Sequence, residues 1–332
     1  MQNQHLQQII TAYALMPDTA IVGEHKEGLS NNYALQSGGA RLFLKVYRHT
    51  DEAKVREIHK VKAYFAEGGI PIVLPRKNVS GETLTILDDT FYALFPYVEG
   101  RHPGKGNITL DELAAMGEML ADMHLQSVKR PFVIDDFFKG WDVETFAAKA
   151  EAILQVIAGK AERTELDNQM EELVLLKRSL VEANTKRFED FNLPNDTLTH
   201  GDYHDFNLFF NDGPHVTWVF DLEKAEMAPR VIELLRSMEY VIMNGDFSQE
   251  NIEKAKHYVR AYHQKYPISK EEVAAGVEVR YIKDFHSLWV EGEYNLKSND
   301  RFNRFFESSY LGLQWLTENR AHLKEELLSV LG

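Results

Sequence analysis

The sequence contains no cysteine among its 332 residues, which excludes disulfides, thiolate metal sites and a cysteine nucleophile. Long hydrophobic runs are also missing: the longest, such as residues 91–98, fall well short of the about 18 apolar residues that a membrane-spanning helix needs. The first residues show neither the basic start nor the apolar segment of a secretory signal. We therefore expect a cytoplasmic protein without a membrane span.

Positive charge is scarce as well, because 37 Lys and Arg residues stand against 51 Asp and Glu residues, for a formal net charge of −14. This balance repels the phosphates of nucleic acids and of anionic membranes, so we expect no nucleic-acid partner. A cationic or neutral small substrate is easier to accept electrostatically. The excess of acid can equally serve solubility alone.

The length suits two lobes, and the composition, with 44% hydrophobic and 27% charged residues, is that of a globular protein with a packed core. Up to about residue 100, short apolar stretches such as 41–47 and 83–87 alternate with glycine, asparagine and proline, which predicts one antiparallel sheet. Between them, residues 51–67 have apolar side chains at helical spacing and end at Gly68 and Gly69. This pattern predicts one helix packed on the sheet.

Glycine and proline are concentrated in residues 95–106, which suits a connector between lobes, and we place the domain boundary there. Helical patterns dominate beyond it, over residues 110–126, 146–161 and 165–188, with a short strand pair near the centre. The sequence therefore predicts an α+β, bilobal fold, with an N-terminal antiparallel β-sheet lobe over residues 1–97 and a mainly helical lobe over residues 98–332.

One segment carries the residues expected to do chemistry. A short strand at 197–199 leads into His200-Gly201-Asp202, and a predicted hairpin over 208–220 follows Asn207 and delivers Asp221. Because the hairpin returns Asp221 to the loop, we expect the oxygens of Asp202, Asn207 and Asp221 to converge. Such oxygens suit Mg²⁺, and phosphoryl transfer needs a metal and a carboxylate that orients the attacking hydroxyl.

The pattern His-Gly-Asp, four residues, Asn, and an Asp after a hairpin resembles the aminoglycoside phosphotransferase and choline kinase superfamily of protein-kinase-like small-molecule kinases, over most of the chain. The resemblance implies that Asp202 is the catalytic base, Asn207 a Mg²⁺ ligand, Asp221 the principal Mg²⁺ ligand and His200 a brace. It further implies ATP and Mg²⁺ as cofactors, and a small-molecule hydroxyl substrate of the aminoglycoside, choline or homoserine type.

Three positions depart from the family pattern. Glu223 stands where the family often has a second Asp, Ala228 precedes Pro229 where Gly is common, and Glu233 replaces the Asp that usually begins the next helix. Asp221 keeps its carboxylate, so its expected role survives, whereas contact between Glu223 and the metal stays open. These departures separate the chain from the best-known antibiotic-modifying members.

The nucleotide phosphates need a cation, which kinases supply from a strand Lys paired with a helix Glu. Lys45 is a charge inside an apolar strand and needs an anionic partner. We predict that this partner is Glu57, with Glu52 as the alternative. Ser30 and Asn31 resemble the family's loop over the phosphates, although an ordinary hairpin turn fits them too. We thus expect residues 1–97 to bind nucleotide and residues 98–332 to carry catalysis and substrate binding.

The acceptor site is less defined. By the resemblance, the aromatic and acidic segment 284–294 lines the acceptor pocket. There Glu291 or Glu293 could pair with an ammonium group stacked on Trp289 or Tyr294, and a sugar could use the same side chains through hydrogen bonds and ring contact. The same aromatic residues could instead be core, with solvated glutamates. Asp205 is a further candidate contact without assigned chemistry.

Two other functions remain compatible with the sequence. One is a protein serine/threonine kinase of the same fold, and the other is a non-catalytic nucleotide-binding module. The presence of Lys45, Asp202, Asn207 and Asp221 together argues against the second. The identity of the acceptor and the choice between ATP and GTP stay open.

Overall fold

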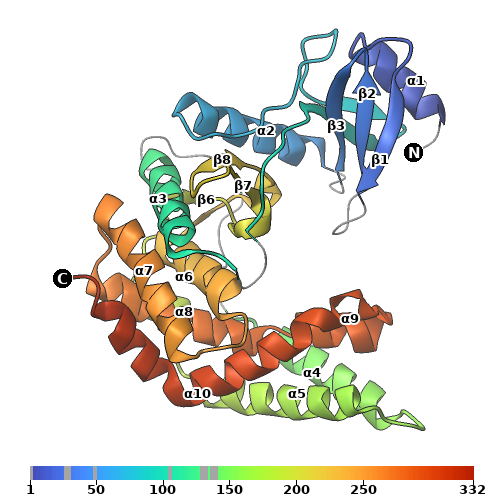
Figure 1. Cartoon of the computed structure of the whole chain (residues 1–332). Coiled ribbons are helices and arrows are strands. Elements are labelled where there is room, and N and C mark those ends of the chain that lie inside the picture. Colours follow the sequence, from blue (N-terminus) through green and yellow to red (C-terminus); the bar gives the residue numbers. More distant parts are fainter. Residues whose placement is uncertain (1–2, 26–30, 48–50, 104–106, 128–133, 135–140) are drawn as a thin grey trace. The chain divides into compact units, whose positions relative to one another are not determined.

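The computed structural model describes residues 3–25, 31–47, 51–103, 107–127, 134 and 141–332 (Figure 1). The chain divides into two compact units. The sheet unit combines Met1–Gly104, Asp122–Asp135 and Leu198–Met227. The helical unit combines Lys105–Ala121, Asp136–Thr197 and Ala228–Gly332.

The sheet unit contains the predicted antiparallel sheet. Its strands are β1 (Ala20–His25), β2 (Asn32–Ser37), β3 (Ala40–Tyr47), β4 (Thr85–Leu87) and β5 (Thr90–Pro96). They lie in the order β1-β2-β3-β5-β4, and each neighbouring pair is antiparallel. The fold class predicted from the sequence is confirmed, and Lys45 lies on the central strand β3, opposite Ala93.

The two faces of the sheet are covered by different helices. Helix α1 (Asn3–Ala12) packs Ile9 on the face that carries Leu42 and Leu44. Helix α2 (Glu52–Glu67) packs Val55 on the opposite face, with Tyr47. Because side chains alternate along a strand, Lys45 shares the α2 face with Tyr47. The sequence predicted one helix in this lobe, and α1 was not predicted.

Helix α2 begins and ends where the sequence predicts. The Asp51 carboxylate caps it by accepting from Ala53 N at 2.9 Å, and the helix stops at Gly68. Its buried stripe consists of Val55, Ile58, His59, Val61, Lys62 and Phe65. Two polar side chains, His59 and Lys62, thus lie among the apolar ones, whereas Glu57 is only partly buried.

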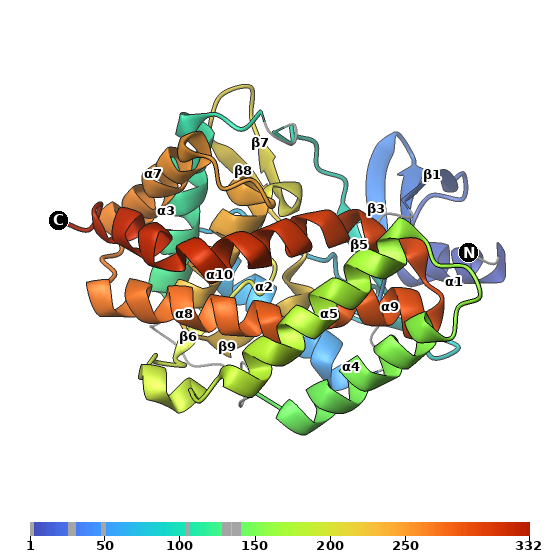
Figure 2. The same cartoon turned by 90° about the horizontal axis from the view of Figure 1, so that it is seen from below.

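The helical unit is built from long amphipathic helices. They are α3 (Leu110–Ser127), whose last turn falls in the sheet unit, α4 (Val143–Ala158), α5 (Glu165–Ala183), α6 (Arg230–Met238), α7 (Gln249–Lys265), α8 (Lys270–His286), α9 (Trp289–Lys297) and α10 (Phe306–Leu328). Helices α8 and α10 run side by side, and α4 contacts both α5 and α9 (Figure 2). None of the helices in the described ranges has the length and hydrophobicity to cross a membrane.

The segment predicted to carry chemistry forms two small strand pairs. Strands β7 (Leu208–Phe210) and β8 (Val216–Val219) make the expected hairpin, whereas the pairing of β6 (Thr197–Thr199) with β9 (Glu226–Ala228) was not expected.

Backbone hydrogen bonds join this hairpin to the N-terminal part of the chain. Val219 N donates to Pro71 O at 2.8 Å, and Arg101 and Phe210 exchange two bonds of 2.9 Å. The compact units accordingly group this segment with the sheet, whereas the predicted boundary at residue 97 assigned it to the helices.

A close helix contact in the helical unit gives a stability prediction. A Cβ added to Gly117 of α3 would lie 2.7 Å from the backbone oxygen of Tyr258 on α7, too close to be accommodated without a backbone shift. Gly117→Ala should therefore lower the free energy of unfolding by about 1–2 kcal/mol, despite the about 1 kcal/mol that alanine adds to helix propensity. Urea unfolding measures this. Gly159→Ala is the control, because its nearest atom would lie at 3.4 Å; equal stabilities of the two variants would contradict the close approach.

Candidate functional site

The site centres on Lys45, which bridges two carboxylates. Its Nζ lies 2.8 Å from Asp221 Oδ1 and also forms an ion pair with Glu223. Lys45 and Glu223 are buried, whereas 43% of the Asp221 side chain is exposed. Burial alone would lower the pKa of Lys45, but the charges of Asp221 and Glu223 outweigh it and hold this pKa above its ordinary value. Lys45 is therefore charged at neutral pH.

Asp221 occupies an unusual backbone conformation two residues after the end of β8. Its φ of 65° and ψ of 54° lie in the left-handed region, which is uncommon for a residue other than glycine. Burial would raise the pKa of its carboxyl, but the charge of Lys45 and its hydrogen bond lower it to about 2. The site thus holds an ionised, half-exposed carboxylate in a fixed position.

The loop between β6 and β7 is braced by its own side chains. Asn207 Nδ2 donates to Asp202 O at 2.9 Å. His200 Nε2 donates to Phe220 O at 2.9 Å, while His200 Nδ1 accepts from Asp202 N at 3.2 Å. Both bonds require the same tautomer of His200. These contacts tie the loop to the end of β8, from which Asp221 follows.

The Asp202 carboxylate has two basic neighbours. Lys224 Nζ lies 2.9 Å from Asp202 Oδ2, and His204 Nε2 lies 3.8 Å from the same oxygen. The turn that places Lys224 here also needs Gly201, whose φ is +77° and whose added Cβ would lie 1.8 Å from Lys224 O. Lys224 was not predicted to belong to the site, although a basic residue directly after Asp-Leu-Glu could have indicated it.

Two oxygens in this group are suited to a metal. Neither Asn207 Oδ1 nor Asp221 Oδ2 forms a hydrogen bond with the residues that the structure describes. Those residues contain no group of three or more acidic or histidine side chains that could hold a metal alone. Mg²⁺ is usually bound by one or two protein oxygens, with water and phosphate completing its shell. The donor set of Asn207 and Asp221 therefore fits Mg²⁺ bound together with a nucleotide.

The expected pairing of Lys45 with α2 is absent among the described residues. The Glu57 carboxylate lies 2.9 Å from Lys60 Nζ, and that of the alternative, Glu52, lies 2.7 Å from Arg56 Nε. The physical reason is the orientation of α2, whose buried stripe runs beside Glu57 rather than through it. The partner of Lys45 comes instead from the turn after β8.

Three other residues, Ser30, Asn31 and Asp205, were also predicted to belong to the site. Ser30 lies outside the described residues, and Asn31 is exposed directly before β2. Asp205 is buried in the short helix Asp205–Asn207, where burial raises the pKa of its carboxyl. Its burial leaves its role as a substrate contact a prediction.

Helix α2 brings a second lysine to this site, which the sequence analysis did not consider. Lys62 is 2% exposed, and its Nζ lies 4.8 Å from the ring centroid of Phe95. Burial, and then the charge of Lys45, lower the pKa of Lys62 to about 8, although Asp221 and Glu223 act in the opposite direction. Two lysines and two carboxylates therefore influence one another here.

In the helical unit, Glu291 is occupied by a structural contact. Its Oε1 lies 2.5 Å from Lys177 Nζ, which also donates to Ser287 O at 2.6 Å, and both side chains are buried. Glu291 is therefore engaged in a buried ion pair with Lys177. Its role as a substrate contact stays a prediction.

The other two acceptor candidates differ from each other. Glu293 accepts from Lys297 at 2.6 Å and from Asn299 at 2.8 Å. Trp289 is 46% exposed, and its ring packs on Phe302 with centroids 4.8 Å apart. Of the three residues predicted in this segment, Trp289 has the side chain most open to a ligand.

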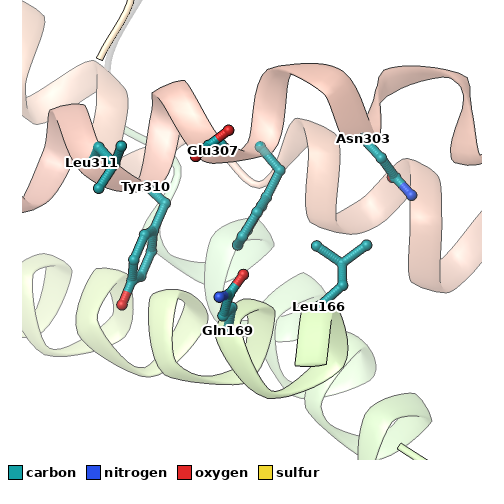
Figure 3. A pocket seen from close by; sticks show the side chains of 7 residues that line it. Leu166, Gln169, Asn303, Glu307, Tyr310 and Leu311 are labelled. Carbon is teal, nitrogen blue, oxygen red and sulfur yellow. The ribbon is translucent and has the colours of Figure 1, made fainter. Parts of the chain in front are cut away.

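The helical unit also contains a pocket of about 300 Å³ between α5 and the first turns of α10 (Figure 3). Its walls mix apolar and polar side chains from Leu166, Gln169, Asn303, Phe306, Glu307, Tyr310 and Leu311. Trp289, Glu291 and Glu293 do not line it. This pocket is therefore separate from the predicted acceptor segment.

Comparison with known families identifies the class of the protein. The family described as "Phosphotransferase enzyme family" matches residues 22–271, more than half of the chain. The chain belongs to this family. The resemblance inferred from the segment between His200 and Asp221 is confirmed, and so is the expected class, a phosphotransferase.

Three solved structures with the same fold are those of small-molecule kinases. A microcompartment-associated aminopropanol kinase aligns with a TM-score of 0.67 and 16% identity over 99% of this chain and 100% of its own. An amicoumacin kinase in complex with AMP-PNP and Ca²⁺ aligns with a TM-score of 0.65 and 11% identity over 98% and 94%. Choline kinase from Cryptosporidium parvum Iowa II aligns with a TM-score of 0.59 and 12% identity over 99% of both chains. At these identities the comparisons establish the fold.

A homoserine kinase from Methylobacillus glycogenes is 31% identical over 99 residues. The match covers 30% of this chain and 30% of the length of that relative. It supports membership of the phosphotransferase family over a limited segment.

The ion pair of Asp221 predicts a pH dependence. A carboxyl with a pKa of about 2 in the folded protein and an ordinary value of 3.8 when unfolded stabilises the fold above pH 3.8, and this contribution is lost as the pH falls towards 2. Asp221→Asn should therefore be less stable than the wild type at pH 7, by about 1 kcal/mol after allowance for exposure. The difference should shrink between pH 4 and 2. Urea unfolding across this range measures it, and a difference that grows on acidification would contradict the ion pair.

The Lys177–Glu291 pair predicts a distinctive pattern of stabilities. Glu291→Leu leaves the Lys177 ammonium buried without its carboxylate and should cost about 3 kcal/mol. The double variant Lys177→Met with Glu291→Leu removes both charges and should recover most of this loss. Thermal or urea unfolding of the two variants provides the comparison. Equal destabilisation by the single and double variants would show that the ion pair is not the reason for the loss.

Proposed function

We propose that the chain is an ATP- and Mg²⁺-dependent kinase that transfers the γ-phosphoryl group to a hydroxyl of a small molecule. The observation that carries this proposal is the placement of Asp202, Asn207, Asp221 and Lys45 in one compact unit, joined by the ion pair and the loop contacts. This set combines a carboxylate for the acceptor, oxygens for a metal and a cation for phosphate, which are the parts that phosphoryl transfer requires.

Each residue has a role in the proposed reaction. Asn207 and Asp221 would hold Mg²⁺, which neutralises charge on the phosphate oxygens when bound. Lys45 binds phosphate, and Asp202 orients the acceptor hydroxyl and accepts its proton. The acceptor oxygen then bonds to the γ-phosphorus as the bond to the bridging oxygen of ADP breaks. Lys224 holds the Asp202 carboxylate in place through its ion pair.

The predicted nucleotide contacts of Glu57, Ser30 and Asn31 are part of the same proposal. So are the roles expected for residues 1–97 and 98–332 and a cytoplasmic location, where ATP is available. Glu57 is a weaker candidate than Lys45 for contact with the phosphates, because its carboxylate is negatively charged and pairs with Lys60.

An amino alcohol is the acceptor class that we favour. The similar proteins named above include kinases of homoserine, aminopropanol and choline, whose substrates all carry an amine or ammonium group near a hydroxyl. A net charge of −14 favours such cationic acceptors. The exposed ring of Trp289 offers a face on which an ammonium group can bind, with Glu293 a few residues away.

Asp202→Asn tests the catalytic base. The variant keeps the shape of the side chain but cannot accept the proton, so turnover should fall by about a hundredfold or more while nucleotide affinity changes little. Mg²⁺-dependent ADP release and calorimetric AMP-PNP binding measure the two quantities. Asp212→Asn, at the exposed tip of the hairpin formed by β7 and β8, is the control. Undiminished turnover in Asp202→Asn would remove Asp202 from this role.

The acceptor is found by screening amino alcohols, other hydroxyl metabolites and antibiotics for Mg²⁺-dependent ADP release. Turnover of one of these compounds supports the small-molecule function. Phosphorylation of a protein such as casein, with no small-molecule turnover, favours the protein kinase alternative instead. Failure to bind or hydrolyse nucleotide would refute both.

A further inference from the structure

Lys62 is a buried cation that has no direct anionic partner among the described residues. It lies on the buried stripe of α2, next to the face of the sheet that carries Lys45. Helix α2 also contacts the turn Leu222–Lys224, which contains Glu223. Lys62 is thus held in the same compact unit as the proposed metal and phosphate groups, close enough for the charges of Asp221 and Glu223 to act on it.

The contacts of Lys62 differ from those of Lys45. Lys45 has two carboxylates, whereas Lys62 Nζ forms no hydrogen bond or ion pair with the described residues and lies against the ring of Phe95. Burying an ammonium group without a direct anion is unfavourable, and proteins rarely retain such a group without a use for it. Helix α2 therefore holds a charge without a direct anionic partner in the part of the chain that the structure describes.

The neighbouring His59 does not supply that partner. Its ring is engaged by Tyr47 Oη at 2.9 Å and Thr83 Oγ1 at 2.7 Å. Burial and the nearby charge of Lys62 lower the pKa of His59 to about 3, so it is neutral at physiological pH. His59 fixes the local packing of α2 on the sheet and leaves the charge of Lys62 unchanged.

We propose that Lys62 is a second phosphate-binding lysine, which contacts a phosphate oxygen of the nucleoside triphosphate bound at Lys45 and Asp221. This inference rests on the proposed function and adds a residue to its nucleotide site. Glu223, from the turn after β8, holds Lys45, and α2 contributes a cation in place of the expected acid.

The charges of the site support this assignment. Lys45 and Lys62 balance Asp221 and Glu223 in the free protein. A divalent metal on Asn207 and Asp221 would leave an excess of two positive charges, which suits a polyphosphate rather than a neutral or cationic ligand. A phosphate oxygen is also a strong acceptor for an ammonium group in a water-poor environment.

Calorimetry with Mg²⁺ and AMP-PNP tests the assignment. Lys62→Met keeps the length and apolar stem of the side chain but removes its charge, and should weaken AMP-PNP binding by about tenfold or more, since a charge-assisted hydrogen bond is lost. Adenosine, which lacks phosphates, should bind both proteins equally. Lys62→Arg should retain part of the affinity.

The control is Lys60→Met, two residues away on the same helix, where 69% of the side chain is exposed; its AMP-PNP affinity should match the wild type. The melting temperature of unliganded Lys62→Met should equal or exceed that of the wild type, because a buried charge has been removed. An AMP-PNP dissociation constant of Lys62→Met within twofold of the wild-type value would overturn the role of Lys62 but not the proposed function. A wild type that binds no AMP-PNP would overturn the proposed function and this inference together.

Labelling of the wild-type protein provides a measurement that does not depend on folding of a variant. An acyl-phosphate derivative of ATP transfers its acyl group to lysine amines beside the bound phosphates, with release of ATP. Mass spectrometry should find Lys62 acylated together with Lys45, and excess ATP should suppress both. Acylation of Lys45 without Lys62 would overturn the proposal.

Discussion

The ion pair between Lys45 and the turn after β8 is the contact on which the arrangement of the site depends. It joins the central strand of the sheet to the residue proposed as the main metal ligand, although 176 positions separate them in the chain. Both partners are charged because each shifts the pKa of the other. The loop that carries Asp202 and Asn207 is fastened to the same turn through His200 and Phe220. The residues proposed to bind nucleotide, metal and acceptor are thereby positioned by one connected set of contacts.

The local contacts of residues 200–207 could be predicted from the sequence because they join near neighbours in the chain, whereas the catalytic role of this segment stays a prediction. The segment from His200 to Asn207 spans eight positions, and hydrogen bonds between its own residues stabilise the loop. The antiparallel sheet and α2 were also predictable, because their apolar periodicity and their caps are short-range signals. These features depend on neighbours in the chain, which a sequence displays directly.

Contacts between distant elements were not predictable in the same way. The prediction that Glu57 pairs with Lys45 was wrong because the rotation of α2 about its axis, which decides which side chains face the sheet, is not given by local sequence alone. A signal was present: Lys62 lies four residues after Ile58 and three before Phe65, on the apolar stripe, and Glu57 does not. The pairing of β6 with β9, and the burial of Glu291 against Lys177, depend on segments that the chain brings together only when folded.

The backbone at Asp221 shows how the chain accommodates its chemistry. Glycine would adopt a φ of 65° without strain, yet it has no carboxylate; aspartate has one and is among the few residues that tolerate this conformation. The chain keeps a local strain of about 1 kcal/mol at the residue on which the ion pair and the proposed metal site both depend. Glycine at this position would relieve the strain but would also remove the ion pair with Lys45, so the two effects on the free energy of unfolding oppose each other at a single residue.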